Sequence, residues 1–437
     1  MKVLNLLIYF FFFLIHIENS LASDVIVNHY TINTKVSFSS KSVQVNLVCN
    51  LRKNTNSQDI QFLFNSSSDL KSVSYLDKNE WRPIMFGFNG RDSLLLTIGN
   101  NTESNRAYEI KFEYSLTIED MNDTLLLLDR GHRWYPLINN QIFTYNLKCE
   151  VPDIYQVLSS GNLTGENNSN GNSVFEFECS NPVFKLPLII FKKDLYQRME
   201  LVSEKNKIEF YSQKIDSSLI SYILHKTDST LNYFTQILGP YSHDKLIFFE
   251  VSDFGGVNVG SGLLTIGTQS VKMIEKGYLD ILILNISQQW YTANVFADFD
   301  SQGFFFFTIS LPHYLRLMYV RDSEGEDAYN KVLLTPIERY KEIAGTENDV
   351  PIISIDMPNT REKGLILYAK GPYVLSLVEK EMGIENWELF LRDTYDSFSG
   401  KIMTLVDFEN LLAKYDSNGK TVELLTRLLN EKGLPED

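Results

Sequence analysis

The side chains that could bind a metal are few in this chain and widely spaced. The histidines beyond the N-terminal segment form no i, i+4 pair: His29, His132, His225, His243 and His313. A zinc site needs three or four His, Cys, Asp or Glu side chains that converge on one point. Asp298 and Asp300 would supply only two oxygen ligands, a set that suits zinc poorly. We therefore assign no metal ligand from the sequence.

Serine or cysteine chemistry has little support either. No G-x-S-x-G elbow occurs, and Cys49, Cys149 and Cys179 form no CxxC pair. One disulfide among the three is open in an exported protein, and buried free thiols in strands are the other interpretation. The glycines between Gly255 and Gly262 do not form a phosphate loop, because no Lys-Ser or Lys-Thr follows them.

The net charge limits the classes of partner, and the N-terminal segment indicates the localisation of the protein. A net charge of -15 over 437 residues disfavours nucleic acid and anionic membrane surfaces as partners. Lys2, the apolar run Leu6 to Ile15 and the small residues Ser20 to Ala22 predict a signal peptide over residues 1–22. We expect a secreted or extracytoplasmic protein. The alternative, an uncleaved anchor, would give a loose membrane or envelope association through this segment.

Two patterns divide the mature chain. From residue 24 to 194, alternating runs such as Val43 to Val48 and turn clusters predict short antiparallel strands in a sandwich or saddle. Helical periodicity dominates afterwards, so we expect domains at 23–195 and 196–437. Strands are expected at 245–251 and 263–267, and helices at 215–238, 279–296, 312–321, 336–343, 364–382, 405–414 and 421–432. The run Phe304 to Phe307 is expected to begin a buried helix or strand, and the acidic run Asp322 to Asp327 to form a solvated loop.

Five segments, in order, resemble peptidase family M1, whose archetype is membrane alanyl aminopeptidase. They are Arg133 to Leu137 with Val151 to Gly161, Asp253 to Leu263, Ile281 to Tyr291, Tyr368 to Gly371 with Val374-Leu375, and Asp407 to Glu436. The resemblance covers nearly the whole mature chain. It implies an α+β protein, with an N-terminal antiparallel β-sandwich or saddle domain followed by a thermolysin-like (gluzincin), mostly helical α/β domain.

The same resemblance shows what chemistry is missing. The family's helix reads HExxH-Q-W; with Gln289-Trp290 as the anchor, the histidines fall on Leu284 and Gln288 and the general base on Asn285. The third zinc ligand falls near Phe307 to Ile309, and no glutamate lies between residues 289 and 321. Zinc is thus implied by the family but not by these side chains, so we expect no cofactor.

Two other family features bear on substrate binding. The glutamate that holds a peptide's free amino group falls on Val259, whereas the oxyanion-stabilising tyrosine is retained as Tyr368. The family's edge strand falls on Gly255, Gly256, Val257, Asn258, Val259 and Gly260. A strand edge binds peptides through main-chain groups, which do not depend on a metal.

The sequence therefore favours an exported pseudo-peptidase that binds a peptide or protein partner in the former cleft. Two alternatives remain: an active zinc metalloaminopeptidase with a non-standard site, and a structural subunit of a cell-surface complex. Each marked residue also has a purely structural interpretation. Asn285 and Gln288 can hydrogen-bond a half-buried helix, Tyr368 can serve packing, and His313 can stand at a helix start.

Overall fold

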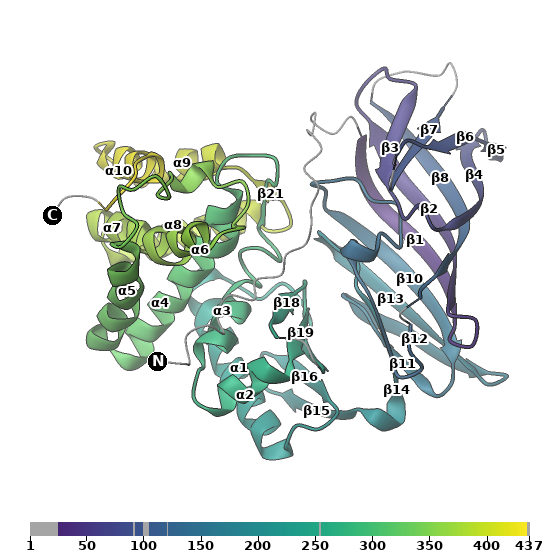
Figure 1. Ribbon diagram of the computed structural model, residues 1–437, viewed down its shortest axis with the longest axis horizontal. Coiled ribbons are helices and arrows are strands. Elements are labelled where there is room, and N and C mark those ends of the chain that lie inside the picture. The colour runs from purple at the N-terminus through teal and green to yellow at the C-terminus, as the bar shows by residue number, and fades with distance from the viewer. Residues whose placement is uncertain (1–24, 91, 99–104, 120, 253–254, 435–437) are drawn as a thin grey trace.

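The computed structural model describes residues 25–90, 92–98, 105–119, 121–252 and 255–434. The expected signal peptide and the start of the edge segment, Asp253, lie outside these ranges. A β-rich half, purple to teal in Figure 1, stands beside a half in which helices predominate, green to yellow. The predicted α+β fold, with a β-rich domain first and a mostly helical domain second, is confirmed.

The first half is built on an eight-stranded sheet in the order β12-β13-β10-β1-β2-β8-β4-β5. Two three-stranded sheets, β11-β14-β9 and β3-β7-β6, accompany it. Alternate residues of β1 and β2 are buried, as the period-2 pattern predicts. The strands are β1 (Val25–Ser37), β2 (Ser42–Lys53), β3 (Asp59–Leu63), β4 (Asp69–Asp77), β5 (Glu80–Pro83), β6 (Met85–Phe88), β7 (Ser93–Thr97), β8 (Arg106–Thr117), β9 (Leu125–Leu128), β10 (Phe143–Pro152), β11 (Tyr155–Leu158), β12 (Asn162–Ser169), β13 (Asn172–Val183) and β14 (Leu188–Lys192), with short 3-10 turns η1 (Arg130–His132) and η2 (Lys193–Leu195).

The three cysteines lie in this half as buried free thiols, on β2, β10 and β13. The free-thiol interpretation is confirmed, and the alternative of a disulfide is not realised. Burial raises the pKa of all three, that of Cys179 to about 12. Such thiols are poor nucleophiles near neutral pH.

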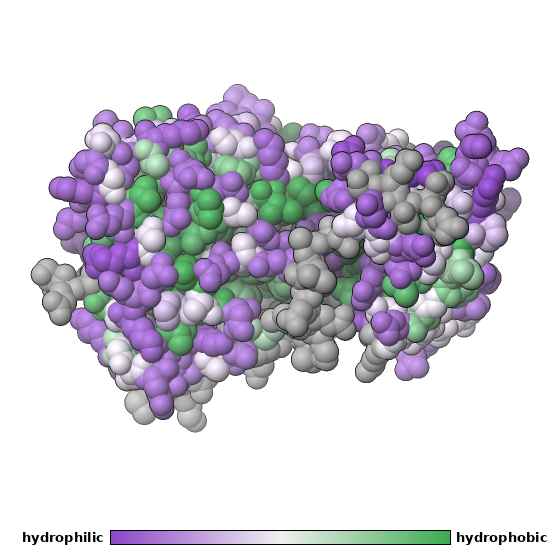
Figure 2. Space-filling model, turned by 90° about the horizontal axis from the view of Figure 1, so that it is seen from above, coloured by the Kyte–Doolittle hydropathy of each residue, from purple (hydrophilic) through white to green (hydrophobic). Residues whose placement is uncertain are grey.

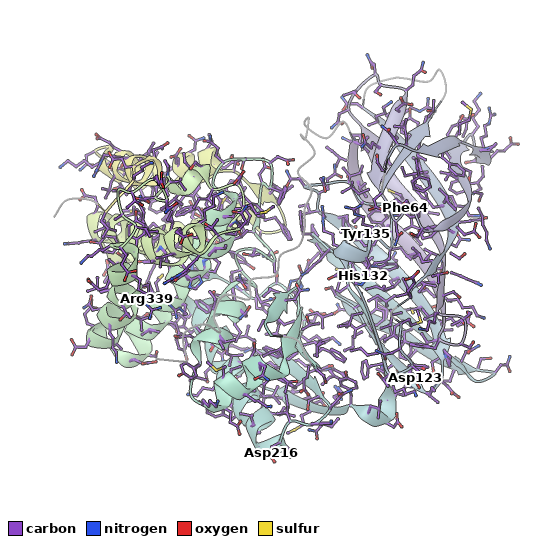
Figure 3. The ribbon with its side chains drawn as sticks, in the orientation of Figure 1. Phe64, Asp123, His132, Tyr135, Asp216 and Arg339 are labelled. Atoms are coloured by element: carbon purple, nitrogen blue, oxygen red, sulfur yellow. The ribbon has the colours of Figure 1, made fainter. Side chains whose placement is uncertain are left out.

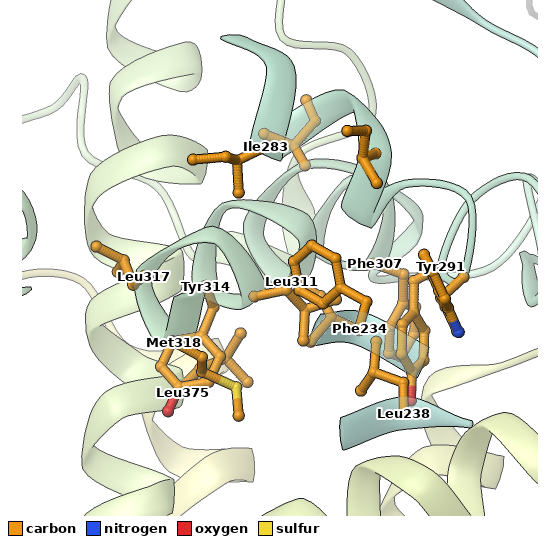
Figure 4. Close-up of a cluster of buried hydrophobic side chains, with 14 of the residues drawn as sticks. Phe234, Leu238, Ile283, Tyr291, Phe307, Leu311, Tyr314, Leu317, Met318 and Leu375 are labelled. Atoms are coloured by element: carbon orange, nitrogen blue, oxygen red, sulfur yellow. The ribbon is translucent and has the colours of Figure 1, made fainter. Parts of the chain in front are cut away.

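The second half contains a five-stranded sheet in the order β15-β16-β17-β19-β18, followed by helices. Its elements are β15 (Gln197–Val202), β16 (Lys207–Ser212), α1 (Ser217–Leu238), β17 (Leu246–Val251), β18 (Val257–Val259), β19 (Leu263–Gly267), α2 (Thr268–Glu275), α3 (Asp280–Ser287), β20 (Phe296–Ala297), η3 (Phe306–Ser310), α4 (Leu311–Glu324), α5 (Glu326–Tyr340), η4 (Ile352–Ser354), α6 (Arg361–Leu365), η5 (Ile366–Lys370), α7 (Gly371–Met382), α8 (Ile384–Phe398), β21 (Ile402–Met403), α9 (Leu405–Leu412) and α10 (Lys420–Asn430). Figure 4 shows the core of this half, where side chains of α1, α3, α4 and α7 meet.

A continuous apolar cluster joins the two halves. Its buried members come from β11 and β14 of the first half, from the five-stranded sheet of the second half, and from Tyr196, which precedes β15. They are Leu158, Ile189, Phe191, Tyr196, Tyr211, Ile247, Phe249 and Leu263. Asn181 Nδ2 also donates to the Ser242 carbonyl oxygen at 2.5 Å. Residues of both halves are therefore in contact through apolar packing and this hydrogen bond.

One expected helix is shorter than its sequence suggests. Residues 279–296 were expected to be helical, but α3 ends at Ser287 and turns follow. Thr292 adopts a positive φ of 116°. Buried Asn294 then donates to the Tyr395 hydroxyl at 2.9 Å and to Ser399 Oγ at 2.8 Å. These bonds to α8, distant in sequence, override the local helical pattern.

Other boundaries are also corrected. The helix expected at 336–343 is α5, which starts at Glu326 and contains Pro336 in its interior. The acidic run 322–327 is not a loop; it forms the end of α4 and the start of α5, separated by Gly325 at φ 91°. Helices α2 and α8 were not expected. Phe304 to Phe307 do begin a helical segment, as one of the two interpretations has it.

The surface is mostly polar, with scattered apolar patches on the face that Figure 2 shows. Within the part of the chain that the structure describes, no helix is both long enough and apolar enough to cross a membrane.

Two π-helical segments, η3 and η5, face each other in the second half. Ser310 Oγ at the end of η3 donates to the Leu367 carbonyl oxygen of η5 at 2.7 Å. A Cβ added at Gly371 would collide with the Ser310 side chain. Only glycine allows this close approach.

We predict that Gly371→Ala lowers the free energy of unfolding by about 1–3 kcal/mol, because the added methyl group overpacks against Ser310. Urea unfolding measures the change. Gly364→Ala is the matched control: it lies in α6, its added Cβ meets open space, and it should raise stability by about 0.5–1 kcal/mol. Equal effects of the two substitutions would contradict the packing argument.

Candidate functional site

The positions that the family resemblance marks lie on α3 and on the two π-helical segments. Leu284 and Asn285 belong to α3, and Gln288 follows its last residue. Gln288 Nε2 donates to the Thr308 carbonyl oxygen of η3 at 3.4 Å. Since η3 is bonded to η5, which carries Tyr368, these positions lie on elements that contact one another. Single π-turns inside helices frequently occur at functional sites.

The two amides at the positions that the resemblance marks, Asn285 and Gln288, are hydrogen-bonded to the backbone. Asn285 Nδ2 donates to the Ile281 carbonyl oxygen of its own helix at 2.5 Å. Together with the bond from Gln288 to η3, this fits the structural interpretation of both residues. Leu284 is half-buried beside them and offers only hydrocarbon.

Gln289 ties α3 to the edge segment, a role that we did not assign from the sequence. It is 1% exposed; its Nε2 donates to the Gly260 carbonyl oxygen at 3.1 Å, and its Oε1 accepts from the Gly262 amide at 3.0 Å. Ser261 Oγ adds a bond to the Ala293 carbonyl oxygen at 2.7 Å. The sequence signal was the polar residue beside Trp290, which we used only to align the helix.

The edge segment has one side without a described strand partner. β18 is the last strand of its sheet and pairs only with β19, antiparallel, within the described residues. Gly260 N and Gly256 O bond to β19 residues, at 2.9 and 2.8 Å. Because bonding alternates along an antiparallel strand, the main-chain groups of Val257 and Val259 point away from β19.

Glycine is needed in this segment at Gly260 but not at Gly255. A Cβ at Gly260 would lie 2.9 Å from the Leu263 carbonyl oxygen, whereas one at Gly255 would meet nothing within 4 Å. Beside Gly260, Lys185 of the first half donates from Nζ to Asn258 Oδ1 at 2.5 Å. Burial lowers the pKa of Lys185 to about 8. The edge strand is therefore approached by a cation rather than by a carboxylate.

Tyr368 is half-buried in η5, and burial raises the pKa of its phenol, opposed by Arg339 and Arg361. Arg339 lies at the end of α5 (Figure 3). The His313 ring lies 6.3 Å from the Tyr368 ring, centroid to centroid. A residue that we expected only at a helix start thus lies beside Tyr368.

His313 is held neutral in this position. Burial, with a smaller contribution from Arg316, lowers its pKa to about 3, and its Nδ1 has no hydrogen-bond partner. Arg316 is itself paired with Asp280 at the start of α3, at 2.9 Å. Nothing in the sequence around His313 signals this arrangement.

The donor set at the marked positions does not fit zinc. Leucine cannot coordinate a metal, carboxamides are weak ligands, and residues 307–309 offer aromatic, hydroxyl and aliphatic side chains. Across the described ranges, no three His, Cys, Asp or Glu side chains are grouped so that they could hold a metal ion. Asp298 and Asp300 both contact Asn140 of the first half instead.

The fold is similar to that of known peptidases. A crystal structure of an M1 zinc metallopeptidase from Deinococcus radiodurans matches with a TM-score of 0.74 at 13% identity, covering 94% of this chain and 95% of that one. A glutamate-to-alanine mutant of an M1 zinc metallopeptidase from the same organism, bound to the substrate Tyr-Ser-Ala, matches with a TM-score of 0.76 at 14% identity, covering 94% and 96%. No protein-family model and no curated protein matches the sequence. The chain therefore has an M1-like fold.

We predict that Gln289→Ala lowers the free energy of unfolding by about 2–4 kcal/mol, since it removes two buried hydrogen bonds, those to the Gly260 carbonyl oxygen and from the Gly262 amide. The neighbouring Gln288→Ala removes one long bond from a half-buried side chain and should cost less than about 1 kcal/mol. Chemical unfolding of both variants provides the comparison. Equal losses would show that Gln289 does not hold the edge segment.

The lowered pKa of His313 predicts a pH-dependent stability. The unfolded chain takes up a proton near pH 6.5, whereas the folded chain does so only near pH 3. The stability from neutral His313 is therefore fully present above pH 6.5 and is lost as pH falls towards 3. His313→Gln should flatten the dependence of the unfolding free energy between pH 6.5 and 4.

The matched control is His225→Gln, at an exposed position on α1. It should keep the wild-type slope. The unfolding free energy of His313→Gln should still depend on pH to some extent, because burial also lowers the pKa of His243, to about 4. If the unfolding free energy of wild type and His313→Gln depended on pH in the same way, His313 would not be held neutral in the folded protein.

Proposed function

We propose that this chain is an exported, non-hydrolytic protein with an M1-like fold that binds a peptide segment along β18. Two observations together carry the proposal. The edge strand β18 is present, and Leu284, Gln288 and residues 307–309 occupy the positions where the family has metal ligands. The sequence of residues 1–22 supports the exported location.

The side chains at the site argue for binding without hydrolysis. Peptide hydrolysis in this family relies on zinc to activate water and polarise the scissile carbonyl, and the marked positions offer no ligands for it. The phenol of Tyr368 alone would stabilise an oxyanion by roughly 2–4 kcal/mol. Enzymes that cleave slow bonds must lower the barrier by about 8–23 kcal/mol. Tyr368 cannot supply that difference.

Peptide binding needs groups that this chain retains. An added strand would bond to the main-chain groups of Val257 and Val259, which point away from β19. The similar structure with bound Tyr-Ser-Ala is a mutant in which a glutamate is replaced, so a peptide is held there despite that substitution.

The preferred peptide differs from that of an aminopeptidase. Val259 replaces the glutamate that would hold a free amino group, and the nearby charge is the ammonium of Lys185. Binding should therefore not require a free N-terminus.

We predict that Tyr-Ser-Ala and its N-acetylated form bind with similar affinity and that neither is cleaved, even after incubation with zinc. Val259→Pro removes one outward N–H without removing a β19 bond, and should weaken binding roughly fivefold to tenfold, the effect of one hydrogen bond. Calorimetry measures affinity, mass spectrometry measures metal content, and chromatography detects cleavage.

Val259→Thr is the control, because it keeps the main-chain donor and a similar side-chain shape. Chelator-sensitive release of tyrosine from the free peptide alone would overturn the proposal in favour of an active enzyme with a non-standard site. Failure of both peptides to bind the folded protein would favour a purely structural subunit.

A further inference from the structure

A cavity lies at the junction of the two halves, and none of its lining residues belongs to α3, β18 or η5. Its volume is about 760 Å³. The first half contributes residues of β11 to β14 and η2, and the second half contributes residues of β15, β16 and the approach to β17. Pockets of 300–1,000 Å³ at domain junctions are typical of small-molecule sites.

The charge of this cavity is opposite to that of the whole chain. Four cations line it (Lys193, Arg198, Lys207 and Lys245) against two carboxylates. One carboxylate, Asp244, accepts from Asn162 Nδ2 at 2.6 Å across the junction. In a protein of net charge -15, such a local excess of positive charge is typical of a site that binds an anion.

Three of the cations converge on a single buried carboxylate, that of Glu209. Its Oε1 lies 3.3 Å from Arg198 Nη2, 3.5 Å from Lys207 Nζ and 3.6 Å from Lys245 Nζ. Glu209 is 3% exposed and also accepts from the Tyr211 hydroxyl at 3.0 Å. One negative charge cannot neutralise three positive ones.

The close spacing of these cations affects the pKa of Lys245. Burial lowers the pKa of the Lys245 ammonium, Glu209 opposes that shift, and Lys207 and Arg198 add to it. Arg198 has a second partner, Glu200, at 2.5 Å, so Glu209 is left to balance both Lys207 and Lys245. A further anion placed between these two would relieve the repulsion.

Apolar side chains line part of the rest of the cavity, together with Gln156, Asn162 and the rings of Tyr196 and Tyr211. Val157, Leu158 and Phe177 are buried, and Leu163 is 40% exposed at the rim. Behind them lies the apolar cluster that joins the two halves. A ligand would therefore meet a preformed surface that combines cations with hydrocarbon.

We propose that this junction cavity binds a small organic anion, with its carboxylate or phosphate group against Lys207 and Lys245 and its apolar body against Leu163 and Phe177. The site is separate from the peptide site on β18 and goes beyond the proposed function. A ligand there contacts both halves and stabilises their junction.

Calorimetry with phenyl phosphate, phenylacetate and the neutral benzyl alcohol tests the proposal on the full mature chain. One or both anions should bind at millimolar concentration or below, with affinity that falls as salt rises, and benzyl alcohol should not bind. The stronger anion identifies phosphate or carboxylate as the natural group. Lys207→Met and Lys245→Met should each weaken binding about tenfold.

Lys214→Met is the matched control, since Lys214 is exposed beyond the far end of β16 and does not line the cavity. It should leave anion affinity unchanged, as should Val259→Pro. Equal weakening by Lys214→Met, unchanged affinity in both cavity variants, or no binding of either anion would overturn the proposal. Lys207 is exposed, so Lys207→Met carries the test if Lys245→Met fails to fold.

Discussion

The carboxamide of Gln289 is buried between α3 and the loop that follows β18, and both of its polar ends are bonded to main chain there. A side chain that is buried and paired on both sides fixes the distance between helix and strand, because neither partner can move without leaving a polar group unpaired. The edge strand, the end of α3 and the π-helical segments therefore keep one geometry.

The architecture and the chemistry of this site have separate physical origins. The architecture comes from apolar packing of α1, α3, α4 and α7, from the close approach at Gly371, and from backbone bonding within the five-stranded sheet. The chemistry of the M1 family would come from a handful of side chains at fixed places. At the positions that the resemblance marks, Asn285 and Gln288 donate to main-chain oxygens of α3 and η3.

Two titratable groups near these positions, His313 and Lys185, have pKa values that burial lowers. His313 stays neutral beside Tyr368, since burial disfavours its charged form. Lys185 of the first half contacts the edge strand, and three cations of the second half surround Glu209. The contact of Lys185 with Asn258 joins the two halves, and the apolar cluster from Leu158 to Leu263 also has members from both.

Local pattern in the sequence was sufficient for the α+β class and for a β-rich part followed by a mostly helical part. These properties depend on residue type and short-range period, which the sequence states directly. It was not sufficient for the early end of α3, where Asn294 bonds to α8, or for the proline inside α5. Nor could it place His313 beside Tyr368 or bring Lys193, Lys207 and Lys245 together. Those outcomes come from contacts between segments far apart in the chain, whose free energy no local window contains.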